Sequence, residues 1–131
     1  MMGLDTNVLV RFLVRDHEAQ FERARRLIKR NVETDEEVLI SLLVLLETEW
    51  VLRSRYKVTK SEMVAAIGAL LDATEVQFED EPTVEEALYT WKDSATEFAD
   101  CLIGAHHRRL GWRATATFDA RAAKLPGFVP S

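Results

Sequence analysis

Four acidic residues lie either within apolar sequence or just before a predicted helix. Asp5 interrupts "GLDTNVLVRFL", and Asp119 follows the apolar stretch "ATATF". Glu47 and Asp100 lie within "LLETEWVL" and "EFADCLIGA", where apolar residues recur at helical spacing. Taken singly, Asp5 and Asp119 are explained by helix capping, and Glu47 by a salt bridge. Taken together, the four carboxylates indicate one acidic site.

Carboxylates that share a crevice repel one another, by roughly 4 kcal/mol for a pair about 4 Å apart at an effective dielectric constant of 20. Such a group needs raised pKa values or a bound cation. A divalent metal ion removes the repulsion most directly, and ligation by oxygen alone favours Mg²⁺, or Mn²⁺ in its place, over zinc. The histidines offer no competing site, because His106 and His107 diverge by about 100° on a helix and His17 is isolated. We therefore predict that Asp5 helps to hold a metal ion.

Two interpretations fit Glu97. It lies one turn before Asp100 on nearly the same face of a predicted helix, which makes it a further metal ligand. Ser94 and Glu97 also have the spacing of a capping box, which gives Glu97 a purely structural role. Glu49, two residues after Glu47, serves as an internal comparison, and we expect it nearer the surface.

The elements that position these residues are strands alternating with helices. Strands are predicted at residues 1–5, 37–41, 74–79, 112–118 and, at an edge, 127–129. Helices are predicted after Asp5 and at residues 18–30, 42–56, 60–73, 84–91, 94–109 and 119–125. Helix 42–56 is apolar nearly all round and should be buried. The alternation predicts the α/β class, with a mostly parallel sheet covered on both faces. The carboxyl ends of such strands meet at one crevice, to which Asp5 and Asp119 would both contribute.

Several helix ends carry recognisable signals. Ser41 is a good N-cap in an otherwise apolar run, and Gly111 is the kind of residue that commonly follows a helix C-terminus. Capping boxes are predicted at Thr59 with Glu62 and at Thr83 with Glu86.

Length and composition place the chain among ordinary globular proteins. Its 131 residues suit one domain, residues 1–131, and 47% of them are apolar. The one cysteine, Cys101, cannot form an internal disulfide, which suits a reducing compartment. No signal peptide is recognised, and the longest nearly apolar run, residues 38–46, is too short to span a membrane. We expect a cytoplasmic protein with no membrane partner.

The charge distribution is uneven. The net charge of −5 argues against a large nucleic-acid footprint. Basic residues gather at 22–30 and 53–57, and acidic residues at 33–37 and 79–81. Each cluster is explained by a solvated helix face or loop, while the basic ones are also candidate contacts for a nucleic-acid backbone.

The ordered set "LDTNVLVRFL", "LLETEWVL", "EFADCLIGA" and "ATFDARAAKLPG" resembles PIN-domain ribonucleases, specifically VapC-type toxins. The resemblance covers essentially the whole chain, and the set is specific although each motif alone is weak. It places the acidic quartet of the family on Asp5, Glu47, Asp100 and Asp119. Many relatives have "DFAD" where this chain has "EFAD", so that Glu97 replaces an aspartate.

The resemblance implies a three-layer α/β/α sandwich with a parallel sheet of about five strands. It also implies Mg²⁺-dependent cleavage of RNA, in a homodimer held by an antitoxin partner, whose basic segment we expect to enter the acidic pocket. Asp5 and Asp100 would be the principal metal ligands, Asp119 would complete the shell, and Glu47 would bind metal or orient the attacking water. Contacts with the RNA substrate are expected from Thr6, Asn7, Thr117 and Arg11.

Three other classes compete with this hypothesis. A phosphatase of the haloacid-dehalogenase type needs a second acid two residues after the first, where this chain has Asn7. A receiver domain carries its phosphoacceptor on a middle strand. A PIN-like module that binds RNA or protein without cutting has no use for four carboxylates that repel one another. A PIN nuclease that is not a toxin remains an alternative.

Overall fold

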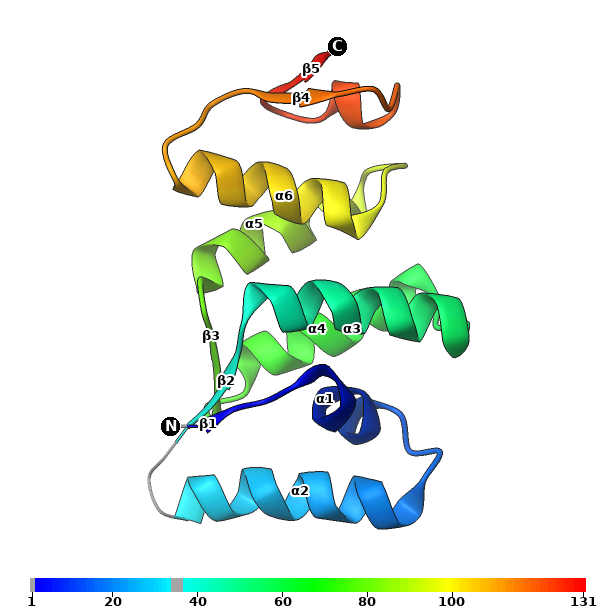
Figure 1. The fold of residues 1–131 in the computed structure, drawn as a ribbon, viewed down its shortest axis with the longest axis vertical. Coiled ribbons are helices and arrows are strands. Elements are labelled where there is room, and N and C mark those ends of the chain that lie inside the picture. Colours follow the sequence, from blue (N-terminus) through cyan, green and yellow to red (C-terminus); the bar gives the residue numbers. More distant parts are fainter. Residues whose placement is uncertain (1, 34–36) are drawn as a thin grey trace. The chain divides into compact units, whose positions relative to one another are not determined.

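The computed structural model describes residues 2–33 and 37–131 (Figure 1). Most of the acidic stretch 33–37 therefore lies outside the described residues. The chain forms two compact units, Met1–Asp80 and Glu81–Ser131, which we call unit 1 and unit 2. Each unit has its own helices and its own set of parallel strands.

Unit 1 is built on a three-stranded parallel sheet with the strand order β1-β2-β3. The strands are β1 (Met2–Gly3), β2 (Val38–Ile40) and β3 (Val76–Phe78). The central strand is the most buried, since Val38 and Ile40 have no exposed surface. This is the environment in which β-branched side chains of a parallel sheet are stable, because helices cover the faces of such a sheet.

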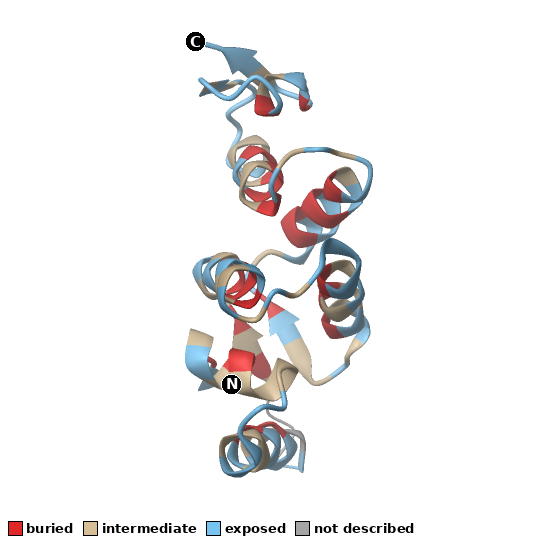
Figure 2. Ribbon diagram, turned by 90° about the vertical axis from the view of Figure 1, so that its right-hand side faces the viewer, coloured by how far each residue is buried: buried red, intermediate tan, exposed pale blue. Residues whose placement is uncertain are grey.

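Four helices of unit 1 are described: α1 (Thr6–Leu13), α2 (Glu18–Glu33), α3 (Leu42–Arg55) and α4 (Lys60–Asp72). Helix α1 packs against α2 and α3, and α4 packs against β3. Buried residues lie on β2 and β3 and on the covering helices (Figure 2). Helix α3 is not buried all round as expected, because Leu43 is 78% and Trp50 is 53% exposed.

Unit 2 contains α5 (Glu81–Lys92), α6 (Phe98–Arg109), the 3₁₀ helix η1 (Ala122–Lys124) and the parallel strand pair β4 (Thr115–Thr117) and β5 (Phe128–Pro130). Helices α5 and α6 pack together, with the rings of Trp91 and Phe98 5.1 Å apart between centroids. The ring of Phe128 lies against Gly104, where an added Cβ would come 3.1 Å from the ring carbon Cζ. Glycine therefore lets β5 approach α6 closely.

The predicted class is confirmed. The structure is helix-rich α/β with parallel strands, consistent with a three-layer α/β/α fold. Among the described residues, the five strands pair as a set of three and a set of two. No helix in the described part of the chain is long and apolar enough to cross a membrane.

Local signals predicted some helix ends correctly and others wrongly. Ser41 caps α3 by accepting from the Val44 N–H (3.2 Å), and the Thr59–Glu62 capping box is present. Gly111 follows α6 with φ = 94°, as a C-terminal glycine should. The predicted Thr83–Glu86 box is wrong, because α5 begins earlier, at Glu81, and Thr83 is buried within it.

Candidate active site

The end of β1 brings Asp5, Thr6 and Glu47 together in unit 1. Asp5 is the N-cap of α1, and its Oδ1 accepts a hydrogen bond from the Val8 N–H (3.0 Å). The Thr6 hydroxyl donates to Oε1 of Glu47, which joins the start of α1 to the middle of α3. In each carboxylate, the second oxygen has no partner among the described residues. Capping and metal binding are therefore compatible at Asp5.

The structure reverses the expectation for the two glutamates of α3. Glu47 is exposed, whereas Glu49 is 2% exposed and pairs with Arg53 at 2.9 Å. The buried face of α3 follows an i, i+3, i+4, i+7 pattern, made by Leu45, Thr48, Glu49 and Leu52. Glu49 lies on this face, and Glu47 lies about 200° away from it around the helix. Glu47 is thus free to act at a surface, while Glu49 belongs to the core.

Asp100 and Glu97 lie at the start of α6 in unit 2. The predicted Ser94–Glu97 capping box is wrong, because α6 begins at Phe98 and Glu97 is the N-cap residue without a side-chain capping bond. The Ser94 hydroxyl instead accepts from the Thr96 N–H (2.9 Å), which closes a local turn before the helix. The structural role that competed with metal binding at Glu97 is therefore removed.

Asp119 follows β4 and is held by its neighbours on both sides. Its Oδ1 accepts from the N–H groups of Arg121 (2.7 Å) and Ala122 (3.1 Å), so that it starts η1. Its own N–H donates to Oγ1 of Thr117 (3.0 Å), the last residue of β4. Thr117 thus supports Asp119, and Oδ2 of Asp119 makes no hydrogen bond within the described residues.

The carboxylates of unit 2 act on one another. Partial burial, then the negative charges of Asp119 and Glu97, raise the pKa of Asp100, while a hydrogen bond from the Glu97 backbone opposes the rise. The pKa of Asp119 is lowered, mainly by hydrogen bonds from the backbone of Ala122 and Arg121. The protein environment therefore disfavours the ionised form of Asp100, and a bound cation would favour it.

The predicted ligands divide between the units, with Asp5 and Glu47 in unit 1 and Asp100, Asp119 and Glu97 in unit 2. In the described part of the chain, no three His, Cys, Asp or Glu side chains form a ready-made metal cluster. The residues nevertheless suit a hard divalent cation, because all the donors are carboxylates and most keep one oxygen without a partner. The convergence of all four in one crevice stays a prediction.

The predicted substrate contacts Asn7 and Arg11 lie four residues apart on α1 and line one cavity of about 270 Å³. Most of the Arg11 guanidinium is engaged, since Nε donates to Gln20 (2.5 Å) and Nη1 to Tyr56 (2.8 Å) and Asp16 (3.1 Å). Arg11 therefore ties α1 to the end of α3 and to the start of α2. This structural role was not visible in the sequence.

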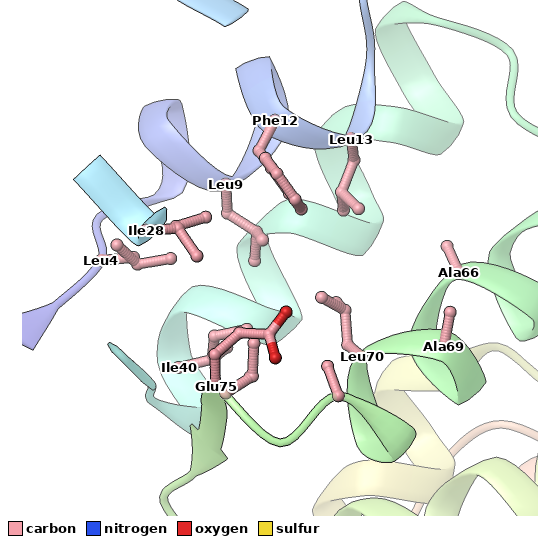
Figure 3. Close-up of a pocket in the computed structure, with 12 residues that line it drawn as sticks. Leu4, Leu9, Phe12, Leu13, Ile28, Ile40, Ala66, Ala69, Leu70 and Glu75 are labelled. Carbon is pink, nitrogen blue, oxygen red and sulfur yellow. The ribbon is translucent and has the colours of Figure 1, made fainter. Parts of the chain in front are cut away.

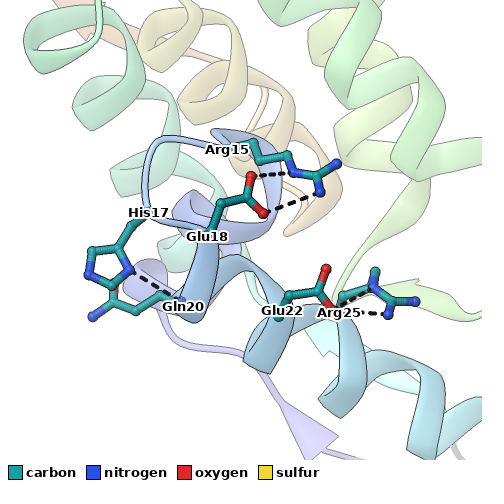
Figure 4. A network of polar contacts seen from close by, with 6 residues as sticks. All are labelled: Arg15, His17, Glu18, Gln20, Glu22 and Arg25. Atoms are coloured by element: carbon teal, nitrogen blue, oxygen red, sulfur yellow. Dashed lines mark hydrogen bonds and ion pairs between the residues drawn. The ribbon is translucent and has the colours of Figure 1, made fainter.

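The basic cluster at residues 22–30 is partly neutralised. Figure 4 shows Arg25 paired with Glu22 at 3.0 Å and, nearby, Arg15 paired with Glu18 at 2.7 Å. In the second cluster, Arg53 is paired with Glu49. The interpretation of these charges as a solvated helix face is therefore correct for Arg25, whereas Arg53 is tied to the buried Glu49.

Unit 1 also contains an apolar cavity of about 260 Å³ (Figure 3). Its lining comes mainly from aliphatic side chains of α1 and α4, and Glu75 is the one charged residue in it. None of the predicted site residues lines this cavity. A single carboxylate among apolar side chains does not make a site for catalysis or for a metal ion, and we do not place chemistry there.

The fold and the acidic residues define a class: a small α/β protein with carboxylates following its parallel strands and beginning its helices. Comparison with known proteins places it within that class. The PIN domain family matches residues 2–127, and the chain belongs to this family. It is also similar to a protein named VapC ribonuclease from Aquifex aeolicus (strain VF5), with 24% identity over 125 residues, 95% of this chain and 92% of that protein.

Proposed function

We propose that this protein is a Mg²⁺-dependent endoribonuclease and the toxin of a toxin–antitoxin pair, folded as a single PIN domain over residues 1–131. The observation that carries the proposal is the position of Asp100 in unit 2, in a chain of the PIN family: partial burial and the negative charges of Asp119 and Glu97 raise its pKa. A cation bound among these carboxylates would neutralise their negative charges and stabilise the ionised form of Asp100. The name of the similar protein supports RNA as substrate.

Asp5 and Asp100 would hold the metal ion, Asp119 would complete its ligand set, and Glu97 would add a further oxygen. Mn²⁺ would be accepted in place of Mg²⁺, since both prefer carboxylate ligands. A metal ion bound there would supply charge neutralisation at the attacked phosphate and a more acidic water. Glu47, exposed on α3 with one oxygen fixed by Thr6, would accept a proton from the attacking water.

The partner side of the proposal follows from charge. The unpartnered carboxylate oxygens match the planar fork of an arginine, which pairs with carboxylates through two hydrogen bonds. An antitoxin segment carrying Arg or Lys would block RNA and displace the metal ion. The net charge of −5 would speed its encounter with a basic segment. We place the toxin in the cytoplasm as a homodimer, where RNA and the antitoxin are found.

The nuclease is tested with purified protein and a mixture of cellular RNA, in Mg²⁺ and in EDTA, beside the Asp100→Asn variant. We expect cleavage by the wild-type protein in Mg²⁺ alone and none by the variant. Binding of RNA without cleavage in any divalent metal would favour the non-catalytic module.

The toxin role is tested separately, by induced expression in a host that lacks the partner. We expect growth arrest with the wild-type chain and normal growth with Asp5→Asn. Normal growth with active, soluble wild-type protein would leave a PIN nuclease that is not a toxin.

A further inference from the structure

Unit 2 contains a polar cavity of about 330 Å³. Its lining includes Asp93, Ser94 and Thr96 from the loop between α5 and α6, and Arg121 and Lys124 from η1. We call it the α5–η1 pocket. Its volume is within the range of roughly 300–1,000 Å³ that is usual for sites that bind small molecules.

Two cations line this pocket, and the charge of one of them, Arg121, also helps to lower the pKa of Asp119. Neither Arg121 nor Lys124 makes a side-chain hydrogen bond or ion pair within the described residues. They are three positions apart at a 3₁₀ helix, where side chains at i and i+3 eclipse one another. The two positive charges therefore project from the same side of η1. An anion between them would neutralise both, and Arg matches a phosphate through paired hydrogen bonds.

The loop between α5 and α6, which contributes other lining residues, is held by several polar contacts. The hydroxyls of Ser94 and Thr96 are 2.7 Å apart, and Oγ1 of Thr96 lies 3.5 Å from Sγ of Cys101. The indole N–H of Trp91 donates to the Thr96 carbonyl (3.2 Å), which fixes the loop to the core of unit 2. A loop that is already ordered loses little entropy when a ligand binds.

The pocket adjoins two proposed metal ligands along the chain. Thr96 immediately precedes Glu97, and Asp119 lies just before η1, where its Oδ1 accepts from the Arg121 N–H at 2.7 Å. A nucleic-acid strand with one phosphate at the acidic residues would present a neighbouring nucleotide at this pocket. Asp93 repels phosphate but accepts hydrogen bonds, as a ribose 2′-hydroxyl requires.

Resting on the proposed nuclease function, we infer that the α5–η1 pocket binds the nucleotide next to the cleaved bond. Arg121 and Lys124 hold its phosphate, and Asp93 accepts from its 2′-hydroxyl. The pocket thereby selects RNA over DNA at one flanking position, a role separate from the metal-binding carboxylates.

The phosphate site is tested by binding of a fluorescent ten-nucleotide single-stranded RNA to Asp100→Asn protein in Mg²⁺, so that cleavage does not interfere. Adding Arg121→Ala and Lys124→Ala should weaken binding about 10-fold. The slope of log K against log salt concentration should fall by about 0.7, because the variant neutralises one phosphate fewer. The single variant Lys124→Arg, in which Arg121 is kept, should retain most of the affinity of the Asp100→Asn parent protein, because its positive charge is conserved.

The control is Arg113→Ala, which removes one positive charge from an exposed residue just before β4 that does not line the pocket; it is compared with each single variant, Arg121→Ala and Lys124→Ala, as well as with the double variant. It should change affinity less than 2-fold. Unchanged affinity and salt slope in the Arg121→Ala, Lys124→Ala variant, with an unchanged melting temperature, would overturn the phosphate site. If Arg113→Ala reduced affinity equally, the loss of net positive charge alone would explain the result, and the phosphate site would be overturned as well.

The ribose contact is tested with RNAs that each carry a single 2′-deoxynucleotide at successive positions. A 2′-deoxy substitution at one flanking position should weaken binding about 5-fold in the parent protein, and it should not weaken binding in the Asp93→Ala variant. The same response in both proteins would overturn the role of Asp93. Because these are binding measurements, they give an answer even if the wild-type chain proves not to cleave RNA, a result that would count against the proposed nuclease alone.

Discussion

The carboxylates of the two units differ in their environment. In unit 1, Glu47 receives the Thr6 hydroxyl and Asp5 receives the Val8 N–H, and both carboxylates are exposed. In unit 2, Asp100 is partly buried, and neighbouring negative charges raise its pKa. The comparison teaches that the carboxylates of unit 1 are exposed and accept hydrogen bonds, whereas Asp100 of unit 2 is partly buried beside the negative charges of Asp119 and Glu97. Unit 2 should therefore respond most to metal.

The largest expected effect is on cleavage. Asp5→Asn and Asp100→Asn should each reduce Mg²⁺-dependent RNA cleavage by roughly 100-fold or more, because each removes a carboxylate that holds charge at the reacting phosphate. The measurement is a single-turnover cleavage rate at saturating Mg²⁺. Near wild-type activity in either variant would show that the quartet is assigned incorrectly.

A large effect on stability is expected from a residue outside the site. Arg53→Met leaves the Glu49 carboxylate, 2% exposed, without its ion-pair partner and should cost roughly 1–3 kcal/mol of the free energy of unfolding. Glu47→Gln, on the exposed face of the same helix, should change stability by less than about 0.5 kcal/mol. Urea denaturation of the two variants measures the difference. An equal loss of stability in the two variants would contradict the assignment of a structural role to Glu49 and a functional role to Glu47.

This difference between Glu47 and Glu49 marks the limit of sequence reasoning. Ser41 and the pair Thr59 and Glu62 act through bonds to their own helix, so their local pattern sufficed. The rotation of α3 could not be predicted in this way. A helix with apolar residues on every side carries little information about which side faces the core, and the packing of α1 and the sheet decides it.

The same limit explains the two capping boxes that were wrong. Ser94 and Thr83 match the pattern as well as Thr59 does, but tertiary contacts assign them elsewhere. Ser94 bonds to Thr96 within a turn, while Thr83 is buried inside α5. Glu86, the expected partner of Thr83, pairs with Arg108 across 22 residues at 2.6 Å. Among the site residues, Asp5 and Asp119 were found where the sequence predicted, at the ends of strands, whereas Asp100 lies in the first turn of α6 because this helix begins at Phe98 and not at Ser94.

A moderate effect is expected at Glu97, which lacks a capping bond and whose charge raises the pKa of Asp100. Glu97→Gln should raise the Mg²⁺ concentration for half-maximal cleavage roughly 10-fold, since Gln keeps the shape but loses the charge. In the absence of metal, the free energy of unfolding of the Glu97→Gln variant should be unchanged or slightly higher than that of the wild type. Cleavage at several Mg²⁺ concentrations measures the shift, and an unchanged dependence would remove Glu97 from the metal site.

The smallest effect, and the most direct test of the comparison, is the pH dependence of stability without metal. The folded state raises the pKa of Asp100 above its ordinary value of 3.8, so it favours the protonated form. The stability associated with this group is full below pH 3.8 and is lost as the pH rises through the folded pKa. Asp100→Asn, which is neutral at every pH, should therefore be more stable than the wild type at pH 7, and the gain should shrink on acidification towards pH 3.8.

Asp119 is the matched opposite, because its pKa is lowered from the same ordinary value of 3.8. The folded state favours its ionised form, so the stability it contributes is present above pH 3.8 and is lost as the pH falls through the folded pKa, below that value. Asp119→Asn should therefore be less stable than the wild type at pH 7, and the loss should disappear only below pH 3.8. Melting temperatures in EDTA between pH 3 and 7 would show the two variants displaced in opposite directions. Displacement of both in the same direction would mean that the charge of Asp100 is already compensated without metal, and the contrast between the two units would fail.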